Sequence, residues 1–205
     1  MLVIVDYDAG NLRSVTRAVE HAGGAPLITS DPDVVRQARA VILPGVGSAA
    51  QAMERLRQLG LDDALREVAG QGVPILGVCL GLQVLLEHSE EGGPTGTICL
   101  GLLPGTVRRF APGPKVPHMG WNTVAVSPPA PLFEGIVNHS YFYFVHSYYG
   151  DPPPETVIGQ TDYPTPFCSV MARDAIVATQ FHPEKSGPDG LRFYANFLRL
   201  AGLCS

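Results

Sequence analysis

One cysteine lies in a setting that suits nucleophilic chemistry. The run Gly77-Val78-Cys79-Leu80-Gly81 joins a buried strand predicted at residues 73–78 to a helix predicted at residues 80–88. Glycines two residues on either side of the cysteine permit the tight strand-to-helix turn of a nucleophile elbow. Such a turn puts the thiol at a helix N-terminus, whose partial positive charge favours the thiolate. The N–H of Leu80 can then stabilise the oxyanion of an attacked carbonyl group.

The alternative for any free cysteine is the role of a small buried hydrophobic residue. We expect that role for the three cysteines that have no flanking turn motif, which are Cys99, Cys168 and Cys204. For Cys79 the bracketing glycines favour a nucleophile instead.

A thiolate nucleophile needs a base, and His182 is the best placed of the six histidines. It follows an apolar strand predicted at residues 176–181, and groups at the ends of parallel strands meet in the crevice where ligands bind. Glu184 lies two residues further on, with Pro183 fixing the backbone between them. A carboxylate there can orient the imidazole and stabilise its charged form. The alternative is a surface turn with an incidental histidine and glutamate.

A second oxyanion donor is predicted in the loop Pro44-Gly45-Val46-Gly47, which follows an apolar strand at residues 40–43. Its glycines let the backbone approach a ligand closely and let a peptide plane rotate with little steric penalty. The candidate donors are the backbone N–H groups of Gly45, Val46 and Gly47. Gln83, one turn into the elbow helix, can turn its amide toward a substrate above Cys79, although a polar residue on a helix face is an equally open interpretation.

Strands and helices alternate in the first half of the chain, which predicts right-handed βαβ crossovers and a parallel sheet. The predicted strands cover residues 2–7, 26–29, 40–43 and 73–78, and the predicted helices include 48–59, 61–69 and 80–88, with Asp31 as an N-cap before Pro32. After residue 90 the pattern changes to loops at 91–94 and 111–114 and short β-rich runs at 123–126, 141–148, 156–160, 167–173 and 176–181, before a last helix at 190–200. Proline-rich turns between these runs predict antiparallel strands. We therefore predict one α/β domain over residues 1–205, with a mixed, mostly parallel central sheet flanked by helices.

The composition excludes several classes of protein. With 205 residues, 45% of them hydrophobic, the chain can bury a core without disulfides, and its four cysteines form no CxxC pair. A net charge of −5 argues against a nucleic-acid-binding surface, and no run of about 20 apolar residues could cross a membrane. The histidines have no metal-site spacing, so we expect no metal and no cofactor. Because no basic leader or cleavage site is present at the N-terminus, we expect a cytoplasmic protein.

Together these motifs resemble those of the class I (triad) glutamine amidotransferases, whose G-x-C-x-G and H-P-E segments form a Cys-His-Glu triad. In this sequence the triad is Cys79, His182 and Glu184. The segments at 115–122 (Lys-Val-Pro-His-Met-Gly-Trp-Asn) and 143–148 (Tyr-Phe-Val-His-Ser-Tyr) resemble one branch, the glutaminase subunits of imidazole glycerol phosphate synthases. The chain departs from the family pattern at Asp8, where glycine is usual, and at Leu82, where methionine is common.

The resemblance implies hydrolysis of glutamine and transfer of the ammonia to a (β/α)₈ cyclase subunit in a heterodimer that serves histidine biosynthesis. It implies low activity until the cyclase and its nucleotide ligand are bound, with a peptide flip in the loop at 44–47 as a candidate switch. Beyond Gln83, it suggests glutamine contacts at Gly47, His146, Ser147 and Tyr148. Candidate residues for the partner interface and the ammonia route are Asn11, Trp121, Tyr143 and Lys185.

Two other functions stay open from the residues alone. A free-standing Cys-His amidase or peptidase, such as a γ-glutamyl hydrolase, would use the same elbow but gives no account of the segments at 115–122 and 143–148. A non-catalytic interaction subunit would not need Cys79, His182 and Glu184 together.

Overall fold

The computed structural model describes residues 1–111 and 115–204. Five parallel strands form the centre of the sheet in the order β2-β1-β3-β4-β14. Their bounds are β1 Leu2–Val5, β2 Pro26–Thr29, β3 Ala40–Gly45, β4 Ile75–Cys79 and β14 Ile176–Thr179. Every residue of β1, β3 and β4 is buried, as expected for parallel strands that are covered on both faces.

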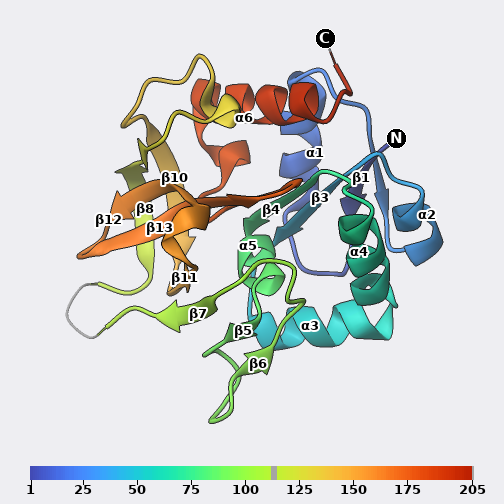
Figure 1. Cartoon of the computed structure of the whole chain (residues 1–205), viewed down its shortest axis with the longest axis horizontal. Coiled ribbons are helices and arrows are strands. Elements are labelled where there is room, and N and C mark those ends of the chain that lie inside the picture. Colours follow the sequence, from blue (N-terminus) through green and yellow to red (C-terminus); the bar gives the residue numbers. More distant parts are fainter. Residues whose placement is uncertain (112–114, 205) are drawn as a thin grey trace.

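Helices cover both faces of this sheet (Figure 1). They are α1 Leu12–His21, α2 Pro32–Arg36, α3 Ala49–Gln58, α4 Leu61–Gly70, α5 Leu80–Leu85 and α6 Gly187–Leu200. Successive side chains of a strand point to opposite faces, so β1 contributes to two separate cores. Leu2 and Ile4 pack in the cluster that includes residues of α1 and α6, whereas Val3 and Val5 pack in the cluster that includes residues of α3 and α4.

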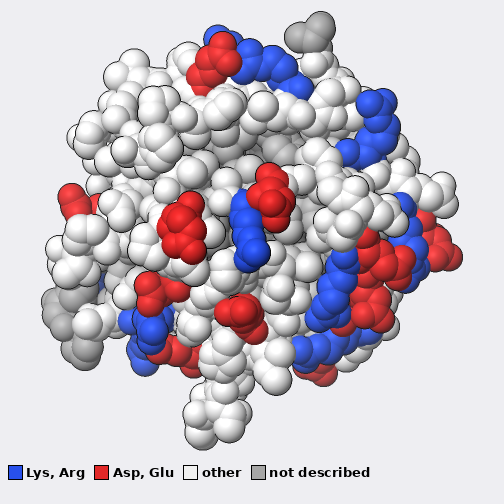
Figure 2. Space-filling model, viewed as in Figure 1, with Lys and Arg blue, Asp and Glu red and all other residues white. Residues whose placement is uncertain are grey.

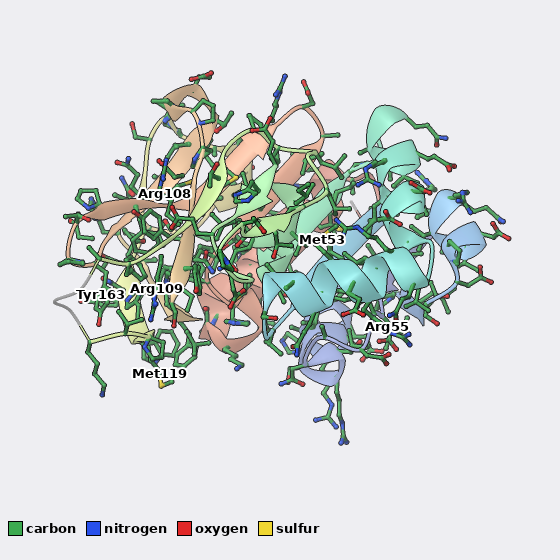
Figure 3. The ribbon with its side chains drawn as sticks, turned by 90° about the horizontal axis from the view of Figure 1, so that it is seen from below. Met53, Arg55, Arg108, Arg109, Met119 and Tyr163 are labelled. Atoms are coloured by element: carbon green, nitrogen blue, oxygen red, sulfur yellow. The ribbon has the colours of Figure 1, made fainter. Side chains whose placement is uncertain are left out.

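The helix boundaries follow from local sequence chemistry. Asp31 caps α2 through a hydrogen bond from the N–H of Asp33, as predicted, and Ser48 caps α3. In α3 the apolar and charged residues lie on opposite sides. Met53 is fully buried toward the sheet, while Arg55 projects from the outer side (Figure 3).

Beyond β14 the sheet continues mainly with antiparallel strands in the order β13-β11-β7-β5-β6, with β5 parallel to β7. These strands are β5 His88–Ser89, β6 Thr97–Ile98, β7 Thr106–Arg109, β11 Tyr148–Asp151 and β13 Pro166–Arg173, and β12 Val157–Asp162 pairs with β13 and with β9 Ala125–Val126. A separate two-stranded antiparallel sheet joins β8 His118–Thr123 to β10 Tyr141–His146. The described residues also form three short 3₁₀ helices: η1 Pro131–Phe133, η2 Pro154–Thr156 and η3 Pro183–Lys185.

The predicted single α/β architecture with a mostly parallel centre is confirmed, but several boundaries were wrong. The elbow helix ends at Leu85 rather than at His88, which belongs to β5. All six residues of α5 are buried, so no amphipathic period marked its end. The run at 141–148 is two strands in different sheets, and β5, β6 and β7 were not predicted because strands of two to four residues carry little periodic signal.

The predicted loop at 111–114 falls outside the described residues at positions 112–114. Within the described parts of the chain, no helix combines the length and the apolar character needed to cross a membrane. On the face shown in Figure 2, basic and acidic side chains alternate, and the charged residues do not gather into a basic patch.

Candidate active site

The predicted sharp turn lies where β4 ends at Cys79 and α5 begins at Leu80. Cys79 has φ +55° and ψ −106°, a strained conformation that non-glycine residues rarely adopt. A Cβ atom on Gly81 would overlap the carbonyl oxygen of Leu43, and one on Gly77 would lie 2.5 Å from the Cδ1 of Leu85. The two flanking glycines are therefore required by close packing of the elbow against neighbouring atoms.

The loop at 44–47 lies directly against the elbow. In the pairing of β3 with β4, Gly45 is opposite Cys79. A Cβ atom on Gly45 would overlap the hydroxyl of Tyr7 and would lie 2.9 Å from the Cβ of Leu80. The Tyr7 hydroxyl donates a hydrogen bond to the carbonyl oxygen of Pro44 at 2.7 Å, which holds the start of the loop. The predicted second source of an oxyanion donor is thus beside Cys79, the candidate nucleophile.

His182 and Glu184 form a buried pair at the end of β14, which is the parallel neighbour of β4. The Nδ1 of His182 lies 2.7 Å from the Oε1 of Glu184, and both side chains are nearly inaccessible to solvent, at 3% and 2% exposure. The hydroxyl of Ser186 donates to the carbonyl oxygen of His182 at 2.6 Å and accepts from the N–H of Tyr143 at 3.0 Å. These bonds tie η3 to β10 and fix the backbone that carries the pair.

The protonated form of His182 is strongly favoured. Burial alone lowers the pKa of His182, but the nearby negative charge of Cys79 and the Glu184 carboxylate outweigh burial and raise the pKa to about 10. The Nε2 atom is buried and has no hydrogen-bond partner among the described residues. A buried donor without a partner is costly, and its presence next to Cys79 is typical of a group kept free for a reactant.

A cavity of about 360 Å³ opens over Cys79, near the lower end of the range for small-molecule sites. Eight residues proposed from the sequence line it: Val46, Gly47, Cys79, Leu80, Gln83, His146, Ser147 and Tyr148. Val145 and two residues that we had not singled out as site residues, Glu91 and Pro117, complete its wall. Gly45, His182 and Glu184 are not among the residues that line this cavity.

Glu91 is the one acidic side chain among the described residues that line the cavity. Its Oε2 accepts a hydrogen bond of 2.6 Å from the N–H of Ala49, at the N-terminus of α3. The Thr97 hydroxyl donates to the Glu91 carbonyl oxygen at 2.6 Å, so the backbone is held as well. Because Ala49 is 42 residues away in the sequence, no local motif distinguished this glutamate from the others.

The amide of Gln83 is held by two bonds inside the site. Its Nε2 donates to the carbonyl oxygen of Tyr148 at 3.0 Å and to the Oε1 of Gln180 at 3.3 Å. Gln180, which sequence reasoning also missed, in turn directs its Nε2 toward the sulfur of Cys79 at 3.7 Å. Since both hydrogens of the Gln83 amide have partners, only its carbonyl oxygen is left for a ligand.

The other cysteines differ from Cys79 in their surroundings. Burial is the main cause that raises the pKa of Cys99 to about 11 and that of Cys168 to about 12. Both residues are buried in the core, as expected for structural cysteines, and Cys204 is partly buried near the C-terminus.

Three of the four interface candidates lie on neighbouring elements. The exposed ring of Trp121 on β8 makes an edge contact with Tyr143 on β10, with centroids 6.0 Å apart. The Lys185 ammonium is 5.7 Å from the centre of the Tyr143 ring. Met119, at the outer edge of β8 in Figure 3, adds a further exposed apolar side chain. Asn11 has a local role, because its Oδ1 caps α1.

The two departures from the family pattern have different structural consequences. Asp8 has φ +62°, a conformation that favours glycine, and its carboxylate accepts from the Nε of Arg55 on α3 at 2.7 Å. This ion pair ties the loop after β1 to the helix that follows the loop at 44–47. Leu82 lies on α5 and is fully buried in the core.

Comparison with known proteins agrees with the geometry. The family model described as Glutamine amidotransferase class-I matches residues 3–201. The chain is 48% identical over 202 residues to imidazole glycerol phosphate synthase subunit HisH of Dehalococcoides mccartyi strain CBDB1, covering 98% of each chain. It is 50% identical over 205 residues to the same-named subunit of Desulfovibrio desulfuricans, covering 96% of this chain and 93% of the relative. A crystal structure of a glutamine amidotransferase superposes with a TM-score of 0.77 over 98% of each chain, at 21% identity, which supports the fold alone.

Proposed function

Because the chain belongs to the class-I glutamine amidotransferase family, we propose that it is the glutaminase subunit of an imidazole glycerol phosphate synthase. It hydrolyses glutamine to glutamate and ammonia, and the ammonia passes to a cyclase subunit. The products there are imidazole glycerol phosphate and aminoimidazole carboxamide ribotide, in histidine biosynthesis. The observation that carries the proposal is the buried pair of His182 and Glu184, 2.7 Å apart, at the strand end next to the Cys79 elbow.

The first step forms a bond between the Cys79 thiolate and the carboxamide carbon of glutamine. The electron pair displaced onto oxygen is stabilised by the N–H of Leu80 and by an N–H from Gly45, Val46 or Gly47. His182 then donates its proton to the amide nitrogen, and the carbon–nitrogen bond breaks to release ammonia. General acid catalysis of this kind contributes about 10²–10⁴-fold, and the raised pKa of His182 keeps the proton available at neutral pH.

The second step hydrolyses the γ-glutamyl thioester. His182, now neutral, accepts a proton from water, and the resulting hydroxide attacks the thioester carbon. The carbon–sulfur bond breaks, which gives glutamate and regenerates the Cys79 thiolate beside the imidazolium. Glu184 holds the ring in one tautomer through Nδ1, so that Nε2 serves both steps.

Glutamine is recognised by one charged side chain, one side-chain amide and backbone polar groups of the cavity. Glu91 offers the one carboxylate among the described cavity residues, so it is suited to the α-ammonium group of the substrate. Gln83 can accept a hydrogen bond through its free carbonyl oxygen, and the segment from His146 to Tyr148, with Gly47 opposite, supplies backbone polar groups.

The loop at 44–47 is the candidate control point of the reaction. Loss of one oxyanion donor typically lowers turnover by about 10²–10³-fold. A flip of one peptide in this loop, on binding of the cyclase and its nucleotide, therefore suffices to turn the enzyme on. Crystal structures of idle and active complexes with the same loop conformation would contradict this switch.

The exposed side chains of Trp121, Tyr143 and Lys185 are proposed to contact the cyclase, with Asn11 at the edge of the same interface. Ammonia transfer requires the two subunits to form a heterodimer that excludes solvent, because free ammonia is protonated in water. We place the protein in the cytoplasm and take residues 1–205 as one catalytic domain.

Glutamate release from glutamine tests the proposal. The chain is assayed alone, with a cyclase subunit and its nucleotide ligand, and as the Cys79→Ala variant. Partner-dependent activity that disappears in Cys79→Ala supports the coupled glutaminase. Equal rates with and without the partner would instead indicate a free-standing amidase, and no activity in a complex that binds the cyclase would indicate an interaction subunit.

A further inference from the structure

A row of buried polar groups leads from the sulfur of Cys79 into the sheet, and the reaction steps above do not use it. Gln180, fully buried, directs its Nε2 toward the Cys79 sulfur at 3.7 Å. Its Oε1 accepts from the Nε2 of Gln83 at 3.3 Å. The same Gln83 nitrogen donates to the carbonyl oxygen of Tyr148 at 3.0 Å. These four groups form one continuous line of hydrogen bonds.

The direction of every bond in this row follows from one carbonyl group. The backbone oxygen of Tyr148 can only accept, so Gln83 must present its NH₂ group to it. The second hydrogen of that NH₂ group then needs an acceptor, which is the Oε1 of Gln180. This orientation leaves the NH₂ group of Gln180 facing Cys79. The sulfur therefore meets an N–H donor and not a carbonyl oxygen.

Two histidines hold the same carbonyl group from the other side. The Nδ1 of His146 lies 2.8 Å from the Tyr148 oxygen, so it carries a proton and leaves Nε2 as an acceptor. That Nε2 lies 2.9 Å from the Nδ1 of His118, whose own Nε2 faces the amide nitrogen of Asn122 at 3.3 Å. Burial lowers the pKa of His146 to about 3 and that of His118 to about 4, which keeps both rings neutral. Neutral rings in these tautomers satisfy every bond of the row.

The surroundings of the sulfur explain why a donor matters there. Cys79 is only 6% exposed, so water contributes little to stabilising a thiolate. The carbonyl oxygen of Val145 also lies near the sulfur, at 4.0 Å. A carbonyl oxygen can accept from a thiol, but it repels a thiolate. Together with the positive charge on His182, an N–H group from Gln180 would shift the equilibrium between thiol and thiolate at Cys79 toward the reactive thiolate.

We propose that Gln180 is a further catalytic residue of this site, donating an N–H···S hydrogen bond to the Cys79 thiolate. Gln83 and the Tyr148 carbonyl group fix its orientation, and His146 and His118 act as positioning residues behind that carbonyl. The role in turnover rests on the proposed glutaminase function, whereas the effect on the sulfur does not.

The direct test is the rate at which iodoacetamide alkylates Cys79 at pH 6 in the full-length chain without glutamine, followed by mass spectrometry of the Cys79 peptide. Gln180→Glu keeps the side-chain oxygen that accepts from Gln83 and replaces the NH₂ group that faces Cys79. Gln180→Leu removes both groups. We expect alkylation about tenfold slower in both variants, since hydrogen bonds to charged groups are worth at least that factor. Thr179→Val is the matched control, because it removes a neighbouring buried hydroxyl that has no partner among the described residues. It should alkylate within about twofold of the wild type.

Steady-state kinetics in the cyclase complex form the second readout. We expect a lower kcat with a KM for glutamine within about threefold of the wild-type value, because Gln180 contacts the sulfur and not the substrate. Wild-type alkylation rates in both folded Gln180 variants would overturn the inference. If the wild-type chain has no glutaminase activity but the Gln180 variants are still alkylated slowly, the hydrogen bond to sulfur is supported. Only the proposed function is then refuted.

A measurement on the wild-type chain remains decisive if both variants unfold. The side-chain amide of Gln180 is assigned by NMR, and its spectrum is compared before and after alkylation of Cys79. A shift of the Nε2–H resonances is expected because alkylation removes the negative charge of the thiolate and weakens the sulfur as a hydrogen-bond acceptor. Unchanged resonances would overturn the inference.

Discussion

Replacing Glu184 with glutamine removes one negative charge from the buried partner of His182 and keeps the shape of the side chain. The 2.7 Å contact between Nδ1 and Oε1 is a charge-assisted hydrogen bond shielded from water, and such bonds are worth about 1.5–3 kcal/mol. If the whole amount is lost from the transition state of thioester hydrolysis, in which the neutral His182 gains a proton and its charge, kcat falls by about 10- to 150-fold when that step limits turnover. The measurement is glutamate release in the complex with a cyclase subunit and its nucleotide ligand, with kcat and KM determined separately.

The same substitution predicts a change in the pH dependence of stability. The pKa of His182 in the folded protein, about 10, lies above its ordinary value of 6.5. Its contribution to the free energy of unfolding is therefore complete below about pH 6.5 and is lost as the pH rises toward 10. Glu184→Gln removes one of the influences that raise this pKa. The stability difference between wild type and variant should be largest near pH 6.5 and should shrink toward pH 10 in denaturant titrations.

Tyr194→Phe is the matched control for this pair. The Tyr194 hydroxyl donates to the other carboxylate oxygen, Oε2 of Glu184, at the longer distance of 3.4 Å. We expect its loss to change kcat by no more than about threefold, since a bond of this length is weak. A Glu184→Gln enzyme whose kcat is within threefold of the wild-type value would refute the reasoning, and so would a loss confined to KM.

Three further predictions follow from the site and its surroundings. Gly81→Ala should lower the free energy of unfolding by about 3 kcal/mol or more in chemical denaturation, because a Cβ would overlap the backbone of Leu43. Gly70→Ala is the control and should have no such cost, because a new Cβ there has no close neighbour within 4 Å. Glu91→Gln should raise the KM for glutamine by about tenfold with kcat nearly unchanged, because it removes a charge-assisted hydrogen bond to the substrate ammonium. An unchanged KM would argue against that contact. Trp121→Ala, which truncates a side chain that is 56% exposed, should weaken binding of the cyclase by about 30-fold in calorimetry, and unaltered affinity would remove Trp121 from the interface.

The parts of the site that could be predicted are those whose requirements are local. A tight turn needs glycine within two residues of Cys79, and the packing around Gly77 and Gly81 shows why. His182 and Glu184 are likewise two residues apart, so their juxtaposition depends mainly on one short backbone segment. The alternation of strands and helices before residue 90 predicted the parallel sheet for the same reason, because each element carries its own periodic signal.

Prediction failed where a residue acts through partners that are far away in the sequence. Glu91 is fixed by Ala49, and Gln180 reaches Cys79 across 101 residues. The run at 141–148 also looked like one strand, since an alternating pattern continues through the point where the chain passes from one sheet to another.

The sequence by itself determined the sharp turn at Cys79, the histidine–glutamate pair, the family and the mostly parallel sheet, because each depends on residue types at short, fixed spacing. Only the tertiary structure decided which polar groups share the cavity and which way their hydrogen bonds run. The orientation of Gln180 depends on the Tyr148 carbonyl group through Gln83, and these residues lie on three different elements or their ends. Such an arrangement is set by the packing of the whole sheet, which brings distant side chains within 3 to 4 Å of one another and excludes the water that would otherwise satisfy them.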